Sequence, residues 1–287
     1  MSGPADAAPL QDWVGRSERA NDVVPAHLAA GLAATLDHGD IAARPGDALP
    51  PLAHWLLLPP LARHSELGPD GHPRRGGFLP PVALPRRMWA GSRVAFHAPL
   101  RVGEVVTRES RIARVEAKQG RAGALVFVTV QHDFHGAAGL AVSDEHDIVY
   151  REAPAPGAPP AAAQQAPDDA TFERSVVPDP VLLFRYSALT FNGHRIHYDR
   201  SYAIQVEGYP GLVVHGPLIA TLLLDLLRRQ QPGADVRRFA FRALRPLFDT
   251  HPFTLCGRPE AGHAGRFALW ARDHEAQLAV QAEAELA

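Results

Sequence analysis

Apolar residues change their spacing along the first 150 residues, and this change indicates a helix followed by a run of strands. Leu28, Leu32 and Leu36 recur at helical spacing within residues 25–38, after an early proline. From residue 93 onward apolar and polar residues alternate, which is typical of half-buried strands. The strands are predicted near residues 93–98, 104–116, 124–134 and 139–150, with turns at 118–120 and 135–136. The Pro- and Gly-rich stretch 59–85 is predicted to be a long loop.

The same order returns in the last 120 residues. Asp179 and Pro180 are typical of the cap and first residue of a helix, which should run through Leu189. A second helix is predicted at 217–230; it is apolar on nearly every face and should be buried all round. The other segments are a polar loop 190–199, a short helix 199–204, a glycine-rich loop 207–216 and strands near 236–245, 251–258, 264–272 and 276–284.

The repeated order predicts an α+β fold in which each half wraps an antiparallel sheet around one long helix. We expect the two halves to pair their sheets edge to edge. Residues 153–170 contain eight Ala and five Pro without periodic apolar positions, so they are predicted to be a linker. The predicted domains are therefore 10–152 and 171–287.

Composition narrows the functional classes. The net charge of −2 gives no indication of a nucleic-acid or anionic-membrane partner. No apolar run approaches the roughly 18 residues of a transmembrane helix, and residues 1–20 lack a signal-peptide pattern. The single cysteine, Cys256, excludes an internal disulfide and fits a reducing compartment. We expect a cytoplasmic protein.

The densest polar stretch of the chain lies between residues 190 and 199, directly after a predicted helix. It contains Asn192, His194, His197, Tyr198 and Asp199. A histidine can exchange protons near neutral pH. A little further on, His215-Gly216-Pro217 opens the apolar helix, whose first N–H groups can stabilise a negative oxygen. These are the two requirements for stabilising an enolate.

The sequence of this stretch resembles the MaoC-like hydratases and dehydratases. It reads RYSALTFNGHRIHYD, followed by Ala203 and then by EGYPGLVVHGPL. It resembles more closely the hydroxyacyl-thioester dehydratases type 2, in the branch that includes itaconyl-CoA and mesaconyl-C4-CoA hydratases. The resemblance implies a double hot-dog fold, with a first domain that lacks the catalytic motif. PRRMWAGSRVAF at 85–96 is similar to the N-terminal half of that branch.

The resemblance implies a hydro-lyase that adds water to a short C4–C5 enoyl-CoA or removes it from the 3-hydroxyacyl thioester. Adding water needs a base for the water, an acid for the α-carbon and a donor for the thioester oxygen. His197 is predicted to be the acid/base residue and the N–H of Gly216 the oxyanion donor. Asn192 stands where the wider family has a catalytic Asp, and an amide cannot exchange a proton at neutral pH. His194, Asp199 or a group from the first block could replace that carboxylate.

The other candidates each have two interpretations. Asp199 could act in catalysis or only cap the helix at 199–204. Arg195 could hold CoA phosphates or lie in solvent, and Arg86 and Arg87 could meet a second carboxylate of the substrate. Further expected substrate contacts are Tyr186, Tyr198 and His215. His132, His135 and His146 lack metal-site spacing, so no metal and no cofactor is expected. A homodimer of such chains is also compatible with the resemblance.

Three alternatives remain at this stage. The first is a 3-hydroxyacyl-ACP or -CoA dehydratase of fatty-acid metabolism. The second is a hot-dog thioesterase, since one fold hosts several chemistries. The third is a non-catalytic acyl-thioester binding protein. The pairing of His197 with the His215-Gly216-Pro217 helix start favours the hydro-lyase.

Overall fold

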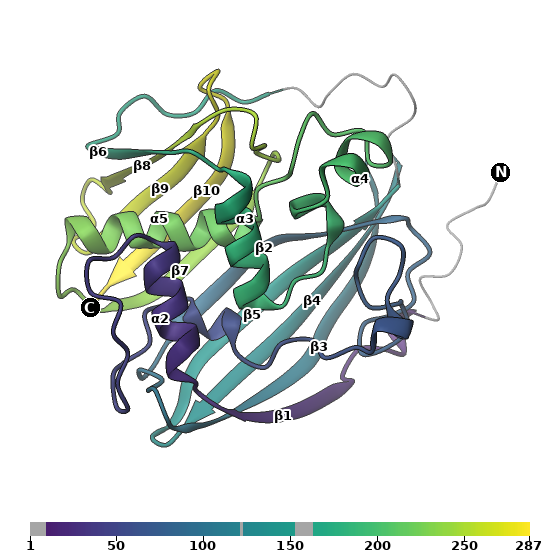
Figure 1. The fold of residues 1–287 in the computed structure, drawn as a ribbon, viewed down its shortest axis with the longest axis horizontal. Helices are drawn as coiled ribbons and strands as arrows, with labels where there is room; N and C mark the ends of the chain where they lie inside the picture. Colours follow the sequence, from purple (N-terminus) through teal and green to yellow (C-terminus); the bar gives the residue numbers. More distant parts are fainter. Residues whose placement is uncertain (1–9, 121–122, 153–162) are drawn as a thin grey trace.

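Ten antiparallel strands form one continuous sheet in the computed structural model, which describes residues 10–120, 123–152 and 163–287. The strand order is β1-β3-β4-β5-β2-β7-β10-β9-β8-β6 (Figure 1). The first half supplies β1 (Ser17–Val23), β2 (Arg86–Phe96), β3 (Val105–Gly120), β4 (Gly123–Gly136) and β5 (Gly139–Arg151). The second half supplies β6 (Phe172–Val176), β7 (Val236–Ala243), β8 (Phe253–Pro259), β9 (Arg266–Arg272) and β10 (Leu278–Leu286).

The two halves join through the antiparallel pairing of β2 with β7, from Gly91 opposite Arg242 to Ala95 opposite Arg238. A β-carbon on Gly91 would overlap the carbonyl oxygen of Phe241, so only glycine lets the strands approach here. The predicted edge-to-edge pairing is confirmed.

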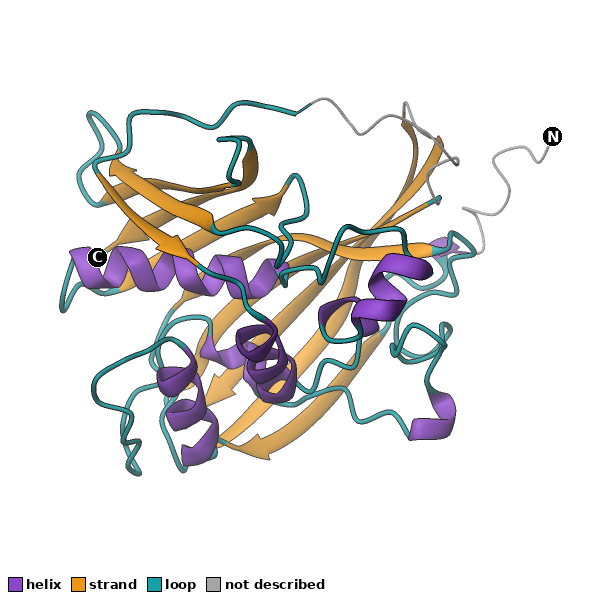
Figure 2. Ribbon diagram, turned by 45° about the horizontal axis from the view of Figure 1, so that its top comes forward, coloured by secondary structure: helices purple, strands orange, loops and turns teal. Residues whose placement is uncertain are grey.

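The helices lie on one side of this sheet (Figure 2). They are α2 (Ala26–Thr35), α3 (Pro180–Thr190), α4 (Arg200–Gln205) and α5 (Gly216–Gln230), with short 3-10 turns at Ala53–Leu56, His64–Glu66 and Arg195–His197. Every residue of α5 from Leu218 to Leu227 is buried, as predicted from its apolar faces. The polar residue Asp225 is accommodated there by Arg174 and Arg229, at 3.0 and 2.8 Å.

The first half is less regular than the second. Its helix α2 has ten residues and packs on α3 of the second half. One apolar core cluster contains side chains from both halves, including Leu32 of α2, Leu183 of α3 and Leu223 of α5. The α+β fold class predicted from the sequence is confirmed. The long helix expected in each half is found in the second half as α5, whereas in the first half α2 has only ten residues.

Several boundaries differ from the sequence prediction. The turns predicted at 118–120 and 135–136 are wrong, because β3 continues to Gly120 and β4 continues to Gly136, each paired with the next strand. The edge strands β1 and β6 were not predicted, since both are short and mostly polar. Residues 153–162 of the predicted linker lie outside the described residues. Among the described helices, none is long and apolar enough to cross a membrane.

Candidate active site

The polar loop starts where α3 ends. Asp179 caps α3 by accepting the N–H of Leu182 at 2.9 Å, as predicted. Phe191 ends the helix in the left-handed conformation, with φ of 51°. The side chain of Asn192 then accepts the backbone N–H of His194 at 3.0 Å, which forms a tight turn. The oxygen of Asn192 therefore shapes the loop that presents the histidines.

His197 is buried and has one free ring nitrogen. Its Nδ1 lies 2.7 Å from the carbonyl oxygen of Val213, so Nδ1 carries the hydrogen and donates it. Nε2 consequently holds a lone pair. Burial lowers the pKa of His197 to about 4, against an opposing effect of the bond to Val213. The neutral imidazole at neutral pH can accept a proton.

His215 stacks on His197, with ring centroids 3.7 Å apart, and caps the N-terminus of α5. Its Nε2 lies 2.8 Å from the hydroxyl of Ser187, and burial holds its pKa well below the usual range. The ring of Tyr186 is 5.2 Å away. Tyr186 is 1% exposed, and its hydroxyl has no hydrogen-bond partner among the described residues.

At the start of α5, the space beside Gly216 is open. Ile219 donates the first intrahelical hydrogen bond, to the carbonyl of His215 at 3.1 Å. The N–H of Gly216 precedes it and is one of the groups that a helix start leaves without an intrahelical partner. A β-carbon at Gly216 would meet nothing within 4 Å, and the residue has no positive φ. Neither packing nor backbone conformation requires glycine there, so the space is available to a ligand.

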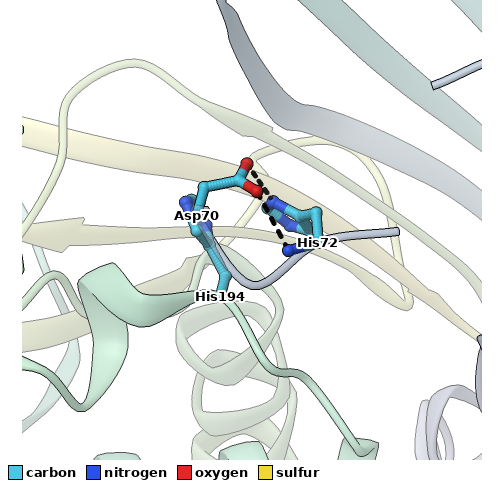
Figure 3. A group of neighbouring side chains, drawn as sticks. All are labelled: Asp70, His72 and His194. Carbon is cyan, nitrogen blue, oxygen red and sulfur yellow. Dashed lines mark hydrogen bonds and ion pairs between the residues drawn. The ribbon is translucent and has the colours of Figure 1, made fainter. Parts of the chain in front are cut away.

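Asp70 and His72 reach this site from the predicted loop 59–85 of the first half. The Asp70 carboxylate points at His72 and accepts its backbone N–H at 3.1 Å and its Nδ1–H at 3.0 Å (Figure 3). The ring of His72 lies 4.0 Å from that of His194, whose ring is 5.4 Å from that of His197. His72, His194, His197 and His215 thus form a row of four imidazoles.

The charges in this row follow from burial. Burial, together with the neighbouring His72 and His197, lowers the pKa of His194 to about 2. Burial also lowers the pKa of His72, whereas the hydrogen bond to Asp70 raises it. Burial would raise the pKa of Asp70, but His72 holds it well below its usual range. Asp70 is therefore an ionised carboxylate beside neutral imidazoles.

The same three residues could bind a cation. The ligand-type atoms of Asp70, His72 and His194 all lie within 4.8 Å of one another. One carboxylate and two imidazoles form a donor set that transition metals accept. The direct bond between Asp70 and His72 satisfies this pair without a metal.

Asp199, Arg195 and Tyr198 contact the loop itself. Asp199 caps α4 through the N–H of Tyr202 at 3.0 Å and binds Arg195 at 2.7 Å. Tyr198 is 46% exposed and donates its hydroxyl to the carbonyl of Gly193 at 3.0 Å. These bonds match the capping interpretation of Asp199.

Arg86 and Arg87 have different surroundings. Arg86 is bound to Glu207, through an ion pair of 3.3 Å and the carbonyl oxygen at 3.0 Å. Arg87 has no ion-pair partner within residues 10–120, 123–152 and 163–287. Its charge is one of the smaller causes that lower the pKa of His72 and His194.

One of the histidines interpreted from spacing alone, His146, has an acidic neighbour after all. His146 lies 2.7 Å from Asp144, which also accepts from Trp55 at 2.7 Å and contacts His54 at 3.0 Å. His132 binds Ser110 instead, at 2.8 Å. Asp144 is fully buried in the first half, and spacing along the chain did not reveal this cluster.

Asp70 and His72 were not among the site residues predicted from the sequence. The available signal was Asp70-Gly71-His72, two ionisable side chains in a long Pro- and Gly-rich loop. Long loops with such residues are often functional. The signal was too weak to connect them with residues more than 120 positions away.

Comparison with solved structures defines the class of fold. A MaoC-like dehydratase from Phytophthora capsici superposes with a TM-score of 0.72 over 95% of both chains, at 15% identity. A Mycobacterium tuberculosis protein described as a double hot-dog fold superposes with a TM-score of 0.54 over 96% of both chains, at 16% identity. The chain has the double hot-dog fold of MaoC-like proteins.

Sequence comparison then shows the family. Residues 52–249 match the hydroxyacyl-thioester dehydratase type 2 family. The chain is 47% identical to mesaconyl-C(4)-CoA hydratase of Chloroflexus aurantiacus over 274 residues, 96% of each chain. It is 27% identical to the mitochondrial hydroxyacyl-thioester dehydratase type 2 of Schizosaccharomyces pombe, over 73% of this chain and 77% of that protein. The chain belongs to the hydroxyacyl-thioester dehydratase type 2 family and is an acyl-thioester hydratase/dehydratase, as the sequence motif predicted.

Proposed function

We propose that this enzyme hydrates a five-carbon dicarboxylic enoyl-CoA, with mesaconyl- or itaconyl-CoA as substrate and citramalyl-CoA as product. The extended similarity to the Chloroflexus hydratase supports this substrate class. Arg87 also supports it, because its positive charge acts on His72 and His194 and no ion pair of Arg87 is found among the described residues. A second substrate carboxylate would supply an ion-pair partner.

The chemistry depends on two groups, the imidazole of His197 and the backbone N–H of Gly216. His197 takes the proton of the attacking water through Nε2, because its Nδ1–H is bound to Val213. The N–H of Gly216 at the start of α5 donates to the thioester oxygen as negative charge develops there, with the helix dipole in support. His215 and Tyr186 pack behind His197 and keep its ring in place.

The free Nε2 of His197, in a ring stacked on the cap residue of α5, is the observation that carries this proposal. The test is an assay with mesaconyl-C4-CoA as substrate. It measures two quantities, the enoyl-thioester absorbance and the amount of free thiol. Loss of absorbance without thiol is expected. Release of thiol would show a thioesterase, and binding without either change would show a binding protein.

Substrate choice can be tested through Arg87. Loss of a charge-assisted hydrogen bond of about 1.5–3 kcal/mol should lower kcat/KM of Arg87→Leu for mesaconyl-C4-CoA about 10–100-fold. The effect on crotonyl-CoA, which lacks the second carboxylate, should be smaller. Arg86→Leu is the matched comparison, because Arg86 is already paired with Glu207. Faster turnover of long-chain 2-enoyl thioesters than of mesaconyl-C4-CoA would favour the fatty-acid dehydratase instead.

The domain boundaries, the location in the cell and the absence of a cofactor are proposed as well. We propose domains at 10–152 and 171–287, supported by the β2–β7 junction between two sheet halves. A cytoplasmic location is supported by the single, buried Cys256. The reaction proceeds with side chains and backbone N–H groups alone, without a cofactor.

A further inference from the structure

A loop of the first half, residues 67–73, lies directly on the polar loop 190–199 of the second half. The carbonyl of Asp70 accepts the N–H of Arg195 at 2.9 Å, and the carbonyl of Pro69 accepts the Arg195 guanidinium at 3.0 Å. A β-carbon on Gly71 would overlap the carbonyl of Gly193, so two glycine backbones touch here. These contacts give the loop one position on the site.

The loop is also braced internally. Gly68 donates its N–H to the carbonyl of His72 at 2.7 Å, and Gly71 donates to the carbonyl of Gly68 at 3.0 Å. Leu67 and Pro73 form an isolated β-bridge at its base. Asp70 and His72 are therefore presented by a closed backbone turn, which suits groups that must hold a fixed geometry.

We propose that His72, oriented by Asp70, is the second proton-transfer residue of this site and fills the role for which Asn192 offers no carboxylate. This inference rests on the proposed hydration and names a further catalytic residue for it. The Asp70 carboxylate stands behind His72 as the acidic member of a catalytic triad stands behind its histidine, where it orients the ring and stabilises the imidazolium.

The other candidates for this role are occupied or unsuited. The carboxylate of Asp199 is bound by Arg195 and the N-terminus of α4. The oxygen of Asn192 is bound by the N–H of His194. Among the described residues His194 has no carboxylate hydrogen-bond partner, whereas His72 is bound to Asp70, and burial lowers the pKa of His194 to about 2.

The hydration step balances with neutral histidines. His197 accepts a proton from water while the water oxygen bonds to the β-carbon, and the C=C π pair moves into the thioester to form an enolate. Its oxygen accepts the N–H of Gly216. His197 gives its proton to a water molecule, and His72 takes one proton from water, where Asp70 stabilises the imidazolium. His72 then gives its proton to the α-carbon. The enolate electrons form the new C–H bond, the carbonyl is restored, and both His197 and His72 are neutral again.

The test compares Asp70→Asn, His72→Asn and the double variant with wild type in mesaconyl-C4-CoA hydration. We expect kcat to fall about 10²–10⁴-fold in each single variant, with KM within threefold and melting temperatures near wild type. The double variant should lose little more than the worse single variant, because the two residues act as a unit. His64→Asn is the matched control, since His64 is an exposed histidine of the longer segment 59–85, which also contains Asp70 and His72.

Each contrary result has a distinct meaning. A single variant that keeps kcat within threefold of wild type overturns the inference while the proposed function stands. Loss of wild-type activity on chelation, with about one equivalent of metal bound to the purified protein, would show instead that Asp70, His72 and His194 hold a cation. Wild-type protein that hydrates no enoyl-CoA refutes the proposed function and this inference with it.

Discussion

Replacing Gly216 by alanine should raise stability and lower activity at once. A β-carbon there meets no atom within 4 Å, so the methyl group causes no clash. Alanine is favoured over glycine in a helix by about 0.8–1 kcal/mol, and by less in the first turn. A gain of about 0.5–1 kcal/mol corresponds to a rise in melting temperature of about 1–4 °C for a chain of this size.

The same methyl group would occupy the space in which the thioester oxygen must meet the Gly216 N–H. A displacement of about 1 Å at a reacting centre can cost about 10²-fold in rate, so kcat/KM should fall by about that factor. The assay is loss of enoyl-thioester absorbance, with thermal melts on the same preparations. Gly77→Ala is the control, because its added carbon also meets nothing within 4 Å. A Gly216→Ala enzyme with full activity would show that the start of α5 does not face the substrate.

Three further outcomes are expected. His197→Ala should lower kcat about 10²–10⁴-fold with the fold intact, measured against His251→Ala as an exposed control; near-normal turnover would remove His197 from the mechanism. Asn192→Ala should loosen the turn at His194 and reduce both activity and melting temperature, whereas an Asn192→Asp variant keeps the accepting oxygen and should melt like wild type; equal melting of both variants contradicts this role. His197 has a pKa of about 4 in the folded protein against an ordinary 6.5. Its contribution to the free energy of unfolding is therefore fully present above pH 6.5 and is lost as the pH falls toward 4. The loss is about 3 kcal/mol in total, and His197→Gln should show a correspondingly shallower fall in unfolding free energy over this range.

Local sequence signals predicted the second half of the site well. The Asp179 cap, the loop at 190–199 and the start of α5 each depend on residues close together in the chain, and the structure places them as expected, with α5 beginning at Gly216. The antiparallel sheet and the β2–β7 pairing likewise followed from apolar alternation and the repeated order.

Long-range contacts account for what the sequence could not show. Asp70 joins the histidines only because glycine backbones at 71 and 193 touch, and no periodicity encodes that contact. Arg86 and Arg87 are adjacent in sequence, yet only the fold shows that Arg86 is paired with Glu207. The short strands β1 and β6 are too polar for alternation to reveal them.

The β2–β7 junction also bears on solubility. Separating the halves would expose β2 and β7 as bare edges, each ready to pair with a strand of another molecule. In the described chain the sheet ends instead at β1, which reads SERANDV and is mostly exposed, and at the five-residue β6. Charged or very short end strands discourage intermolecular pairing. Joining the halves in one polypeptide therefore protects both from aggregation, and either half made alone should precipitate or form strand-paired oligomers.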